Sequence, residues 1–302
     1  MDTYYDFTNA KVDKFKGYRG ANGQKISIFF NDERYMLKFQ PIKNGIKSQS
    51  CISEYISCHI FNAIGIKAQE TLLGSYEGIP VVACKDFETN GYKLMEFAML
   101  KNSLIISSQN GYGTELTDVQ TAIENQELLP VNKLKEHFWD TFIVDSLLGN
   151  FDRHNGNWGI LVNAEENQAI IAPVYDCGSC LYPKPTEAQI EQILSSEDEI
   201  NNRIYLFPTS EIKQEDKKIN YFEYISSLKN KDCTAALRRI APKINLEKID
   251  QIIDNTPEIS DLRKQFYKTM IRKRKEKIID FSLKKYRKRE IQRKMNRGDF
   301  SR

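Results

Sequence analysis

The sequence LLGNFDRHNGNWGILV, residues 147–162, is the most informative part of this 302-residue chain. An apolar stretch ends in a loop rich in Gly and Asn, which leads into the apolar run WGILV. The loop contains Asp152 and, five positions later, Asn157. A second apolar run, AIIAPVY (169–175), then precedes Asp176. This order predicts a helix, a polar loop and a hairpin of two strands.

The three polar residues predict a site for phosphoryl transfer. If the hairpin folds back, Asp176 returns close to Asn157, because paired strands lie ~4.8 Å apart. The reaction needs a base for the attacking hydroxyl and oxygen ligands for Mg²⁺ on the phosphates. We therefore expect Asp152 to be the catalytic base and Asn157 and Asp176 to be the metal ligands. The alternative is that they are ordinary turn residues that satisfy backbone donors.

A strand lysine supports this interpretation. QKISIFF (24–30) and YMLKF (35–39) alternate in polarity and predict a β-hairpin. Lys38 lies between apolar neighbours, where an ammonium is costly unless it meets an anion. Strand alternation puts Met36 on the same face, so Met36 would cover an adenine while Lys38 reaches the phosphates. The alternative is an exposed strand lysine.

A helix and a Gly-rich segment flank this hairpin. Ser50 stands at the expected N-cap, isoleucines then recur every four residues, and Gly65 suits the helix end. The helix carries Glu54, either as a partner for Lys38 or on a solvated face. Before the hairpin, KGYRGANGQK (16–25) provides glycines that can bring backbone N–H groups close to phosphates: Gly17, Gly20 and Gly23.

Patterns of apolar and turn residues predict a β-rich first part. Residues 67–76 and 78–87 are two further strand candidates that would complete a small antiparallel sheet. Beyond Phe87 the patterns become helical. We expect residues 1–87 to form a small β-rich lobe that binds ATP.

The remaining residues predict a larger helical part. Thr117 and Gln120 suit a capping box, and an apolar stripe over residues 134–147 predicts a long helix that ends at Gly149. We expect residues 88–302 to form a mainly α-helical lobe that carries the catalytic loop and the metal site. The predicted fold class is α+β, a two-lobed protein-kinase-like fold with its ligand in the cleft.

These motifs resemble those of the HipA-like serine/threonine kinases. The similarity runs from about residue 16 to 180 and includes the short CtkA-type members, which lack the extra amino-terminal domain of longer HipA toxins. It implies an ATP- and Mg²⁺-dependent kinase acting on protein Ser or Thr hydroxyls. Asp152 would be the base, Asn157 and Asp176 would hold Mg²⁺, and the other ATP contacts would come from Lys38, Gly20, Gly23, Met36, Glu54 and the connector Lys85, Asp86 and Phe87.

Neighbouring residues are expected to support this site. Asp145 lies on the helix before the loop, where a buried carboxylate would cap loop N–H groups. Arg153 and His154 are expected to be structural hydrogen-bonding residues. The Gly-rich segment has Ala21 and Asn22 where family members often carry an autophosphorylated serine, so that form of self-inactivation is not expected.

Charge is unevenly distributed along the chain. Residues 263–302 hold 17 Lys and Arg against 4 Asp and Glu, so this tail has a net charge of +13. The whole chain has a formal charge of +3, so the rest of the chain is acidic, at 3 − 13 = −10. The pattern predicts a solvated basic helix, with nucleic acid or an acidic partner as the alternative. No run approaches about 18 apolar residues, and the amino terminus lacks a signal-peptide layout. We expect no membrane span and a cytoplasmic protein; delivery to another cell has no signal to support it.

Two other functions fit the same residues. The same apparatus could phosphorylate a small-molecule or lipid hydroxyl. A catalytically silent nucleotide-binding protein could instead use the basic tail to dock nucleic acid or an acidic partner. The intact set of Asp152, Asn157, Asp176 and Lys38 favours catalysis.

Overall fold

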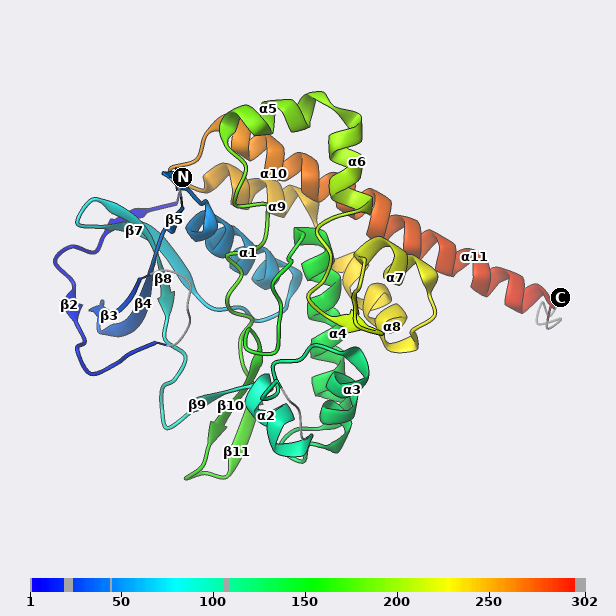
Figure 1. Cartoon of the computed structure of the whole chain (residues 1–302), viewed down its shortest axis with the longest axis horizontal. Coiled ribbons are helices and arrows are strands. Elements are labelled where there is room, and N and C mark those ends of the chain that lie inside the picture. The colour runs from blue at the N-terminus through cyan, green and yellow to red at the C-terminus, as the bar shows by residue number, and fades with distance from the viewer. Residues whose placement is uncertain (1, 19–23, 44, 106–108, 297–302) are drawn as a thin grey trace.

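The computed structural model describes residues 2–18, 24–43, 45–105 and 109–296. A β-sheet with one helix against it forms the first part, and the remainder is mainly helical (Figure 1). Both parts agree with the α+β arrangement predicted from the sequence. Among the described residues, no helix combines the length and apolar character needed to cross a bilayer.

The first part is built around a six-stranded sheet in the order β1-β7-β8-β4-β3-β2. Strands β3 and β4 form the predicted hairpin, although β4 begins at residue 33 rather than 35. Its turn residues Asn31 and Asp32 both have positive φ, 50° and 60°, as tight two-residue hairpins require. The strands are β1 (Tyr4–Asp6), β2 (Lys11–Val12), β3 (Lys25–Phe30), β4 (Glu33–Phe39), β7 (Thr71–Tyr76) and β8 (Ile79–Lys85). A separate hairpin joins β5 (Ile42–Lys43) to β6 (Ile46–Lys47).

The two faces of the sheet differ. Tyr35 and Leu37 of β4 pack into an outer apolar cluster, whereas Met36 packs on the opposite face, against the main core. Lys38 shares the face of Met36 because strand side chains alternate. This confirms the predicted placement of Met36 and Lys38 on one face.

Helix α1 (Ser50–Ile64) packs on that inner face. It ends as predicted at Gly65, which has φ 90°. The prediction that Ser50 is the N-cap was wrong: Gln49 precedes the first helical residue and makes no side-chain cap. The Gln49 N–H instead bonds to the carbonyl of Pro183, so a tertiary contact defines this helix start.

The second part is organised around α4 (Val131–Leu148), which ends as predicted at Gly149, with φ 66°. The predicted capping box at Thr117 was wrong, because Thr117 lies inside α3 (Leu116–Asn125) and Glu115 precedes it without a side-chain cap. The other helices are α2 (Phe97–Leu104), α5 (Glu187–Ser195), α6 (Glu197–Tyr205), α7 (Tyr221–Ser227), α8 (Lys231–Ile240), α9 (Leu246–Asn255), α10 (Asp261–Arg274) and α11 (Phe281–Asn296), with a 3₁₀ turn at Ala241–Lys243, a π-helical segment at Lys275–Asp280 and a small hairpin of β12 (Lys213–Gln214) and β13 (Lys217–Lys218).

A three-stranded sheet places the segment predicted to be catalytic beside the first part. Strand β10 (Gly159–Asn163) pairs with β9 (Lys93–Glu96) and with β11 (Gln168–Ile171), which confirms the predicted hairpin. The second strand ends at residue 171, earlier than predicted. Beyond it, Val174 bridges to Ala68, and this contact brings Asp176 back towards the six-stranded sheet.

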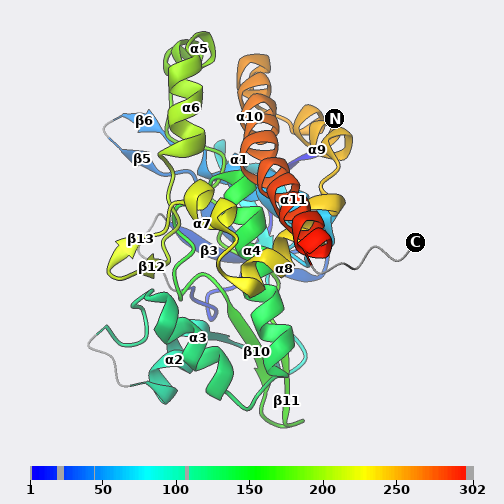
Figure 2. The ribbon, with the colours of Figure 1, turned by 90° about the vertical axis from the view of Figure 1, so that its right-hand side faces the viewer.

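The basic tail is only partly solvated. Helix α10 packs beside α5, α6 and α9 (Figure 2), and its Arg274 is fully buried. The Arg274 guanidinium donates to the carbonyl of Ser146 over 2.7 Å and to the Tyr182 hydroxyl over 3.2 Å. The prediction of a solvated basic helix was therefore wrong for α10. It describes α11, which extends beyond the helical part in Figure 1 and exposes most of its Lys and Arg side chains.

A substitution at Gly74 can test how closely β7 packs against β1. A Cβ there would lie 2.1 Å from the carbonyl oxygen of Tyr5, on the neighbouring strand β1. We expect Gly74→Ala to lower the free energy of unfolding by about 1–3 kcal/mol, measured by thermal denaturation. Gly17→Ala is the matched control, because a Cβ at Gly17 meets no described atom within 4 Å. Equal stability of the two variants would contradict this account of the sheet.

Candidate active site

Lys38 lies between two carboxylates from separate parts of the chain. Its ammonium is 3.1 Å from Glu54 Oε2 on α1 and 3.0 Å from Asp176 Oδ1 beyond β11. Burial opposes the charge of Lys38, but Asp176 and Glu54 outweigh it and hold the pKa of Lys38 well above its usual value. The structure thus pairs Lys38 with Glu54, as the sequence predicted, rather than leaving an exposed lysine. It also pairs Lys38 with Asp176, which the sequence placed near Asn157 as a metal ligand.

Asp176 has a strained backbone and a partly exposed side chain. Its φ is 56°, in the left-handed region that non-Gly residues seldom occupy. The Lys38 ammonium lowers the pKa of the Asp176 carboxyl, which is therefore ionised near neutral pH. Its side chain is 43% exposed, whereas that of Glu54 is 2% exposed. Asp176 can thus reach a ligand, and Glu54 acts on one only through Lys38.

The loop predicted to be catalytic fixes Asp152 and Asn157 against each other. The Asn157 amide nitrogen donates to the backbone carbonyl of Asp152 over 2.8 Å, which leaves the amide oxygen directed elsewhere. Asp152 Oδ2 accepts a hydrogen bond of 3.3 Å from the Ser179 hydroxyl. Burial raises the pKa of Asp152. Ser179 was not assigned a role from the sequence, because one Ser three residues after Asp176 forms no recognisable pattern.

Arg153 holds this loop in place through buried hydrogen bonds. Its guanidinium makes a bidentate contact with Asp145, with nitrogen–oxygen distances of 3.0 and 3.1 Å. It also donates to the carbonyls of Asn157, over 2.9 Å, and Tyr175, over 2.5 Å. The expectation that Asp145 caps loop N–H groups was wrong: besides Arg153 it accepts a side-chain bond from Asn150. One buried ion pair therefore joins α4, the loop and the residues before Asp176.

The connector between the two parts begins at Lys85, the last residue of β8. The Lys85 carbonyl accepts a bond of 2.9 Å from Gln69, and the Asp86 N–H donates to the carbonyl of Arg34 over 2.8 Å. The Lys85 ammonium lies 2.7 Å from Glu33, on the outer face of the sheet, so only its backbone lies at the connector. Phe87 packs against the Tyr175 ring.

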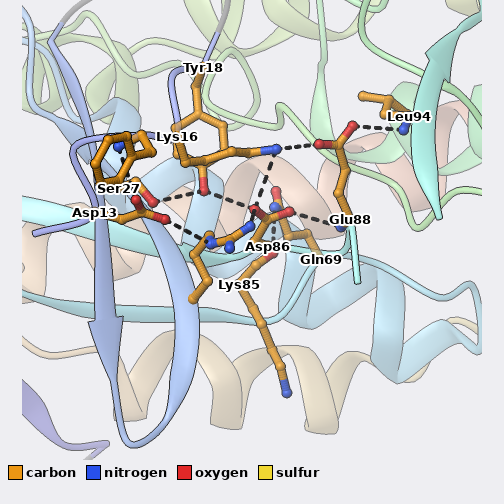
Figure 3. Close-up of polar contacts among 11 residues, drawn as sticks. Asp13, Lys16, Tyr18, Ser27, Gln69, Lys85, Asp86, Glu88 and Leu94 are labelled. Atoms are coloured by element: carbon orange, nitrogen blue, oxygen red, sulfur yellow. Dashed lines mark hydrogen bonds and ion pairs between the residues drawn. The ribbon is translucent and has the colours of Figure 1, made fainter. Parts of the chain in front are cut away.

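Asp86 sits at the centre of a polar cluster beside this connector. Figure 3 shows Tyr18 and Lys16, from the start of the Gly-rich segment, approaching its carboxylate. The sequence placed only the backbone of Asp86 in the site, because a contact between residues 68 positions apart has no local pattern. Gly20 and Gly23, which were also predicted to bind ATP, lie outside the described residues.

Comparison with known proteins identifies the family. The sequence model of the HipA-like C-terminal domain matches residues 20–256. The serine/threonine-protein kinase CtkA of Helicobacter pylori is 51% identical over 280 residues, which span 91% of this chain and 86% of that protein. The chain belongs to the HipA-like kinase family. It is a serine/threonine protein kinase of the HipA and CtkA type, as the motifs predicted.

Solved structures agree with the fold of this HipA-like chain. The crystal structure of the Helicobacter pylori proinflammatory kinase CtkA matches with a TM-score of 0.89 and 49% identity, covering 93% of this chain and 96% of that one. HipA of Shewanella oneidensis MR-1, solved with HipB and operator DNA, matches with a TM-score of 0.53 and 14% identity, over 90% of this chain and 69% of that one. The α+β kinase fold is therefore confirmed.

The buried Asp145–Arg153 pair predicts that removing a carboxylate from α4 costs much more stability at position 145 than at position 140. Asp145→Ala would leave the Arg153 guanidinium buried without its counter-charge, so we expect the free energy of unfolding to fall by about 3–5 kcal/mol. Asp140→Ala is the matched control: Asp140 pairs with Arg239, which is one-third exposed, and its loss should cost about 0–1 kcal/mol. Urea denaturation measures both. Similar losses in the two variants would show that the buried pair does not support the loop.

Proposed function

We propose that this HipA-like chain transfers the γ-phosphate of ATP to a protein Ser or Thr hydroxyl in the cleft between Lys38 and the catalytic loop. The observation that supports it most is the Lys38 ammonium held at 3.1 and 3.0 Å from Glu54 and Asp176. An ammonium so placed can also contact phosphate oxygens, because it has three donors and Asp176 is open to the cleft.

The residues present fit a Mg²⁺ ion. Asp176 offers a partly exposed carboxylate, and Asn157 offers an amide oxygen, because its nitrogen is engaged by the Asp152 carbonyl. Both are hard oxygen donors of the kind that Mg²⁺ prefers. Asp176 and Glu54 both pair with the Lys38 ammonium, so the proposed metal ligand Asp176 lies directly beside the group that would contact the phosphates. When bound there, Mg²⁺ would neutralise charge on the phosphates.

Asp152 is proposed as the base. Its Oδ2 already accepts a hydrogen bond from the hydroxyl of Ser179, so a hydroxyl can approach this carboxylate within hydrogen-bond distance. An acceptor Ser or Thr that takes this position would be oriented by Asp152. Its oxygen would bond to the γ-phosphorus and its proton would pass to Asp152, while the bond from that phosphorus to the β-phosphate oxygen breaks and ADP leaves. Arg153 keeps the loop in place beneath these groups.

The base of ATP is proposed to lie at the other end of the same face. Met36 would cover the adenine, and the backbone at Lys85, Asp86 and Phe87 would bind its edge through groups other than the Lys85 and Asp86 N–H, which already donate to Glu70 and Arg34. Gly20 and Gly23, outside the described residues, are kept as predicted ATP contacts. The boundary between the lobes is proposed near residue 87, where β8 ends and the connector begins.

The phosphate acceptor, the partner of α11 and the cellular location are also proposed. The acceptor is proposed to be a protein hydroxyl rather than that of a small molecule or lipid, following the serine/threonine-protein kinase relative. The exposed basic side chains of α11 are proposed to meet a nucleic acid or an acidic partner. A cytoplasmic location is kept as a prediction.

The catalytic assignment predicts a specific loss of transfer. Asp152→Asn keeps the shape of the side chain but removes the base, so we expect phosphate transfer to fall by about 10²–10⁴-fold while ATP still binds. Asp176→Asn removes a charged metal ligand, so it should lower transfer and raise the Mg²⁺ concentration that transfer requires. The assay measures transfer of labelled γ-phosphate from ATP to a protein acceptor over a range of Mg²⁺ concentrations.

Asp140→Asn, on α4 and paired with Arg239, is the matched control and should transfer phosphate like the unaltered protein. Undiminished transfer by a folded Asp152→Asn variant would refute the assignment of the base. Label found only on added small molecules or lipids would refute the protein acceptor.

A further inference from the structure

Residues 16–18, at the start of the Gly-rich segment, are held to the connector by side-chain contacts (Figure 3). The Tyr18 hydroxyl lies 3.1 Å from Asp86 Oδ2 and 3.4 Å from Ser27 Oγ. The Lys16 ammonium pairs with Glu88 and lies 3.7 Å from Asp86 Oδ2. Residues 16–18 and residues 86–88 are far apart in the sequence, and these contacts hold them side by side.

Tyr18 reaches the inner face of the sheet, where Lys38 lies. In the β3–β4 register Ser27 is opposite Met36 and Lys25 is opposite Lys38, and cross-strand partners lie on the same face. The hydroxyl of Tyr18, bonded to Ser27, is therefore at the Met36 end of this face. That end is the one next to the connector, because Tyr35 is paired with Lys85.

Asp86 is the residue that organises these contacts. Its side chain is 3% exposed, and such a carboxylate is stable only where donors compensate it. Oδ2 lies near Tyr18, Lys16 and the Arg34 guanidinium, the last at 3.5 Å, while Oδ1 accepts the Glu88 N–H over 2.8 Å. The bonds to Arg34 and Glu88 hold the carboxylate on the connector, so Asp86 sets the position of the Tyr18 hydroxyl.

Glu88 extends the contact to the helical part. One of its oxygens pairs with Lys16, and the other accepts the N–H of Leu94 over 2.8 Å. Leu94 belongs to β9, which pairs with β10 of the catalytic hairpin. Lys16 and Glu88 therefore link the segment that leads into β3 to the three-stranded sheet that contains β10.

We propose that Lys16, Tyr18, Asp86 and Glu88 form a latch that holds the Tyr18 ring as the outer wall of the base subsite. The proposal rests on the proposed function, since it assumes that ATP lies with its base near Met36 and its phosphates near Lys38. Tyr18 then acts by contact of its ring with a purine, while Asp86 and Lys16 are positioning residues. The latch contributes to binding of the base and not to binding of the phosphates.

The test compares dissociation constants for ATP and for adenosine, measured by calorimetry on the full chain. Tyr18→Ala removes the wall and should weaken both ligands by about tenfold. Tyr18→Phe keeps the ring but loses the bond to Asp86, so it should weaken both by about threefold. Lys16→Met should resemble Tyr18→Phe, whereas Lys14→Met, a change at a neighbouring exposed lysine, should bind both ligands normally.

Lys38→Met distinguishes binding of the phosphates from binding of the base, because it should weaken the binding of ATP and leave the binding of adenosine unchanged. The latch is refuted if Lys38→Met loses ATP while Tyr18→Ala and Tyr18→Phe bind adenosine as the unaltered protein does. Weakening of ATP but not of adenosine by the Tyr18 variants would also refute it. Failure of the unaltered protein to bind ATP at all would overturn the proposed function itself.

Discussion

An ammonium held between two carboxylates connects the parts of this protein that any phosphate chemistry requires. Lys38 comes from the sheet, Glu54 from α1 and Asp176 from the segment beyond β11, and the three meet within 3.1 Å. Burying these charges is favourable only while they remain together, because an unpaired charge in such a site is strongly destabilising. The constraint brings the sheet close to the catalytic loop and leaves Asp176 partly open to the cleft.

Arg153 holds the loop of Asp152 and Asn157 in place, as Lys38 holds Glu54 and Asp176 together. Its bonds to Asp145 and to the carbonyls of Asn157 and Tyr175 hold the loop and the approach to Asp176 as one unit. The loop that carries Asp152 and Asn157 is thereby held in place by two buried side chains, those of Arg153 and Asp145. Such preorganisation matters for phosphoryl transfer, where catalysis consists mainly of positioning and charge compensation.

Much of the fold and of the site could be predicted because it is encoded locally. The spacing of Asp152 and Asn157, the apolar hairpin before Asp176 and the lysine within a strand each depend on a few adjacent residues. Helix starts were predicted less well, since tertiary contacts such as the Gln49 bond to Pro183 define them. The buried Arg274 could not be recognised within a basic run, and the meeting of Tyr18 with Asp86 depends on residues 68 positions apart. Interactions over such separations leave no periodic pattern in one sequence.

The central claim is that this cleft holds Mg²⁺ and ATP in one defined orientation. The most direct measurement is a crystal structure of the protein with Mg²⁺ and a non-hydrolysable ATP analogue. We predict the phosphates within hydrogen-bond distance of Lys38, the metal on the oxygens of Asn157 and Asp176, the γ-phosphate facing Asp152 and the base beside Met36. A nucleotide bound elsewhere, or a metal that does not contact Asn157 and Asp176, would contradict the account.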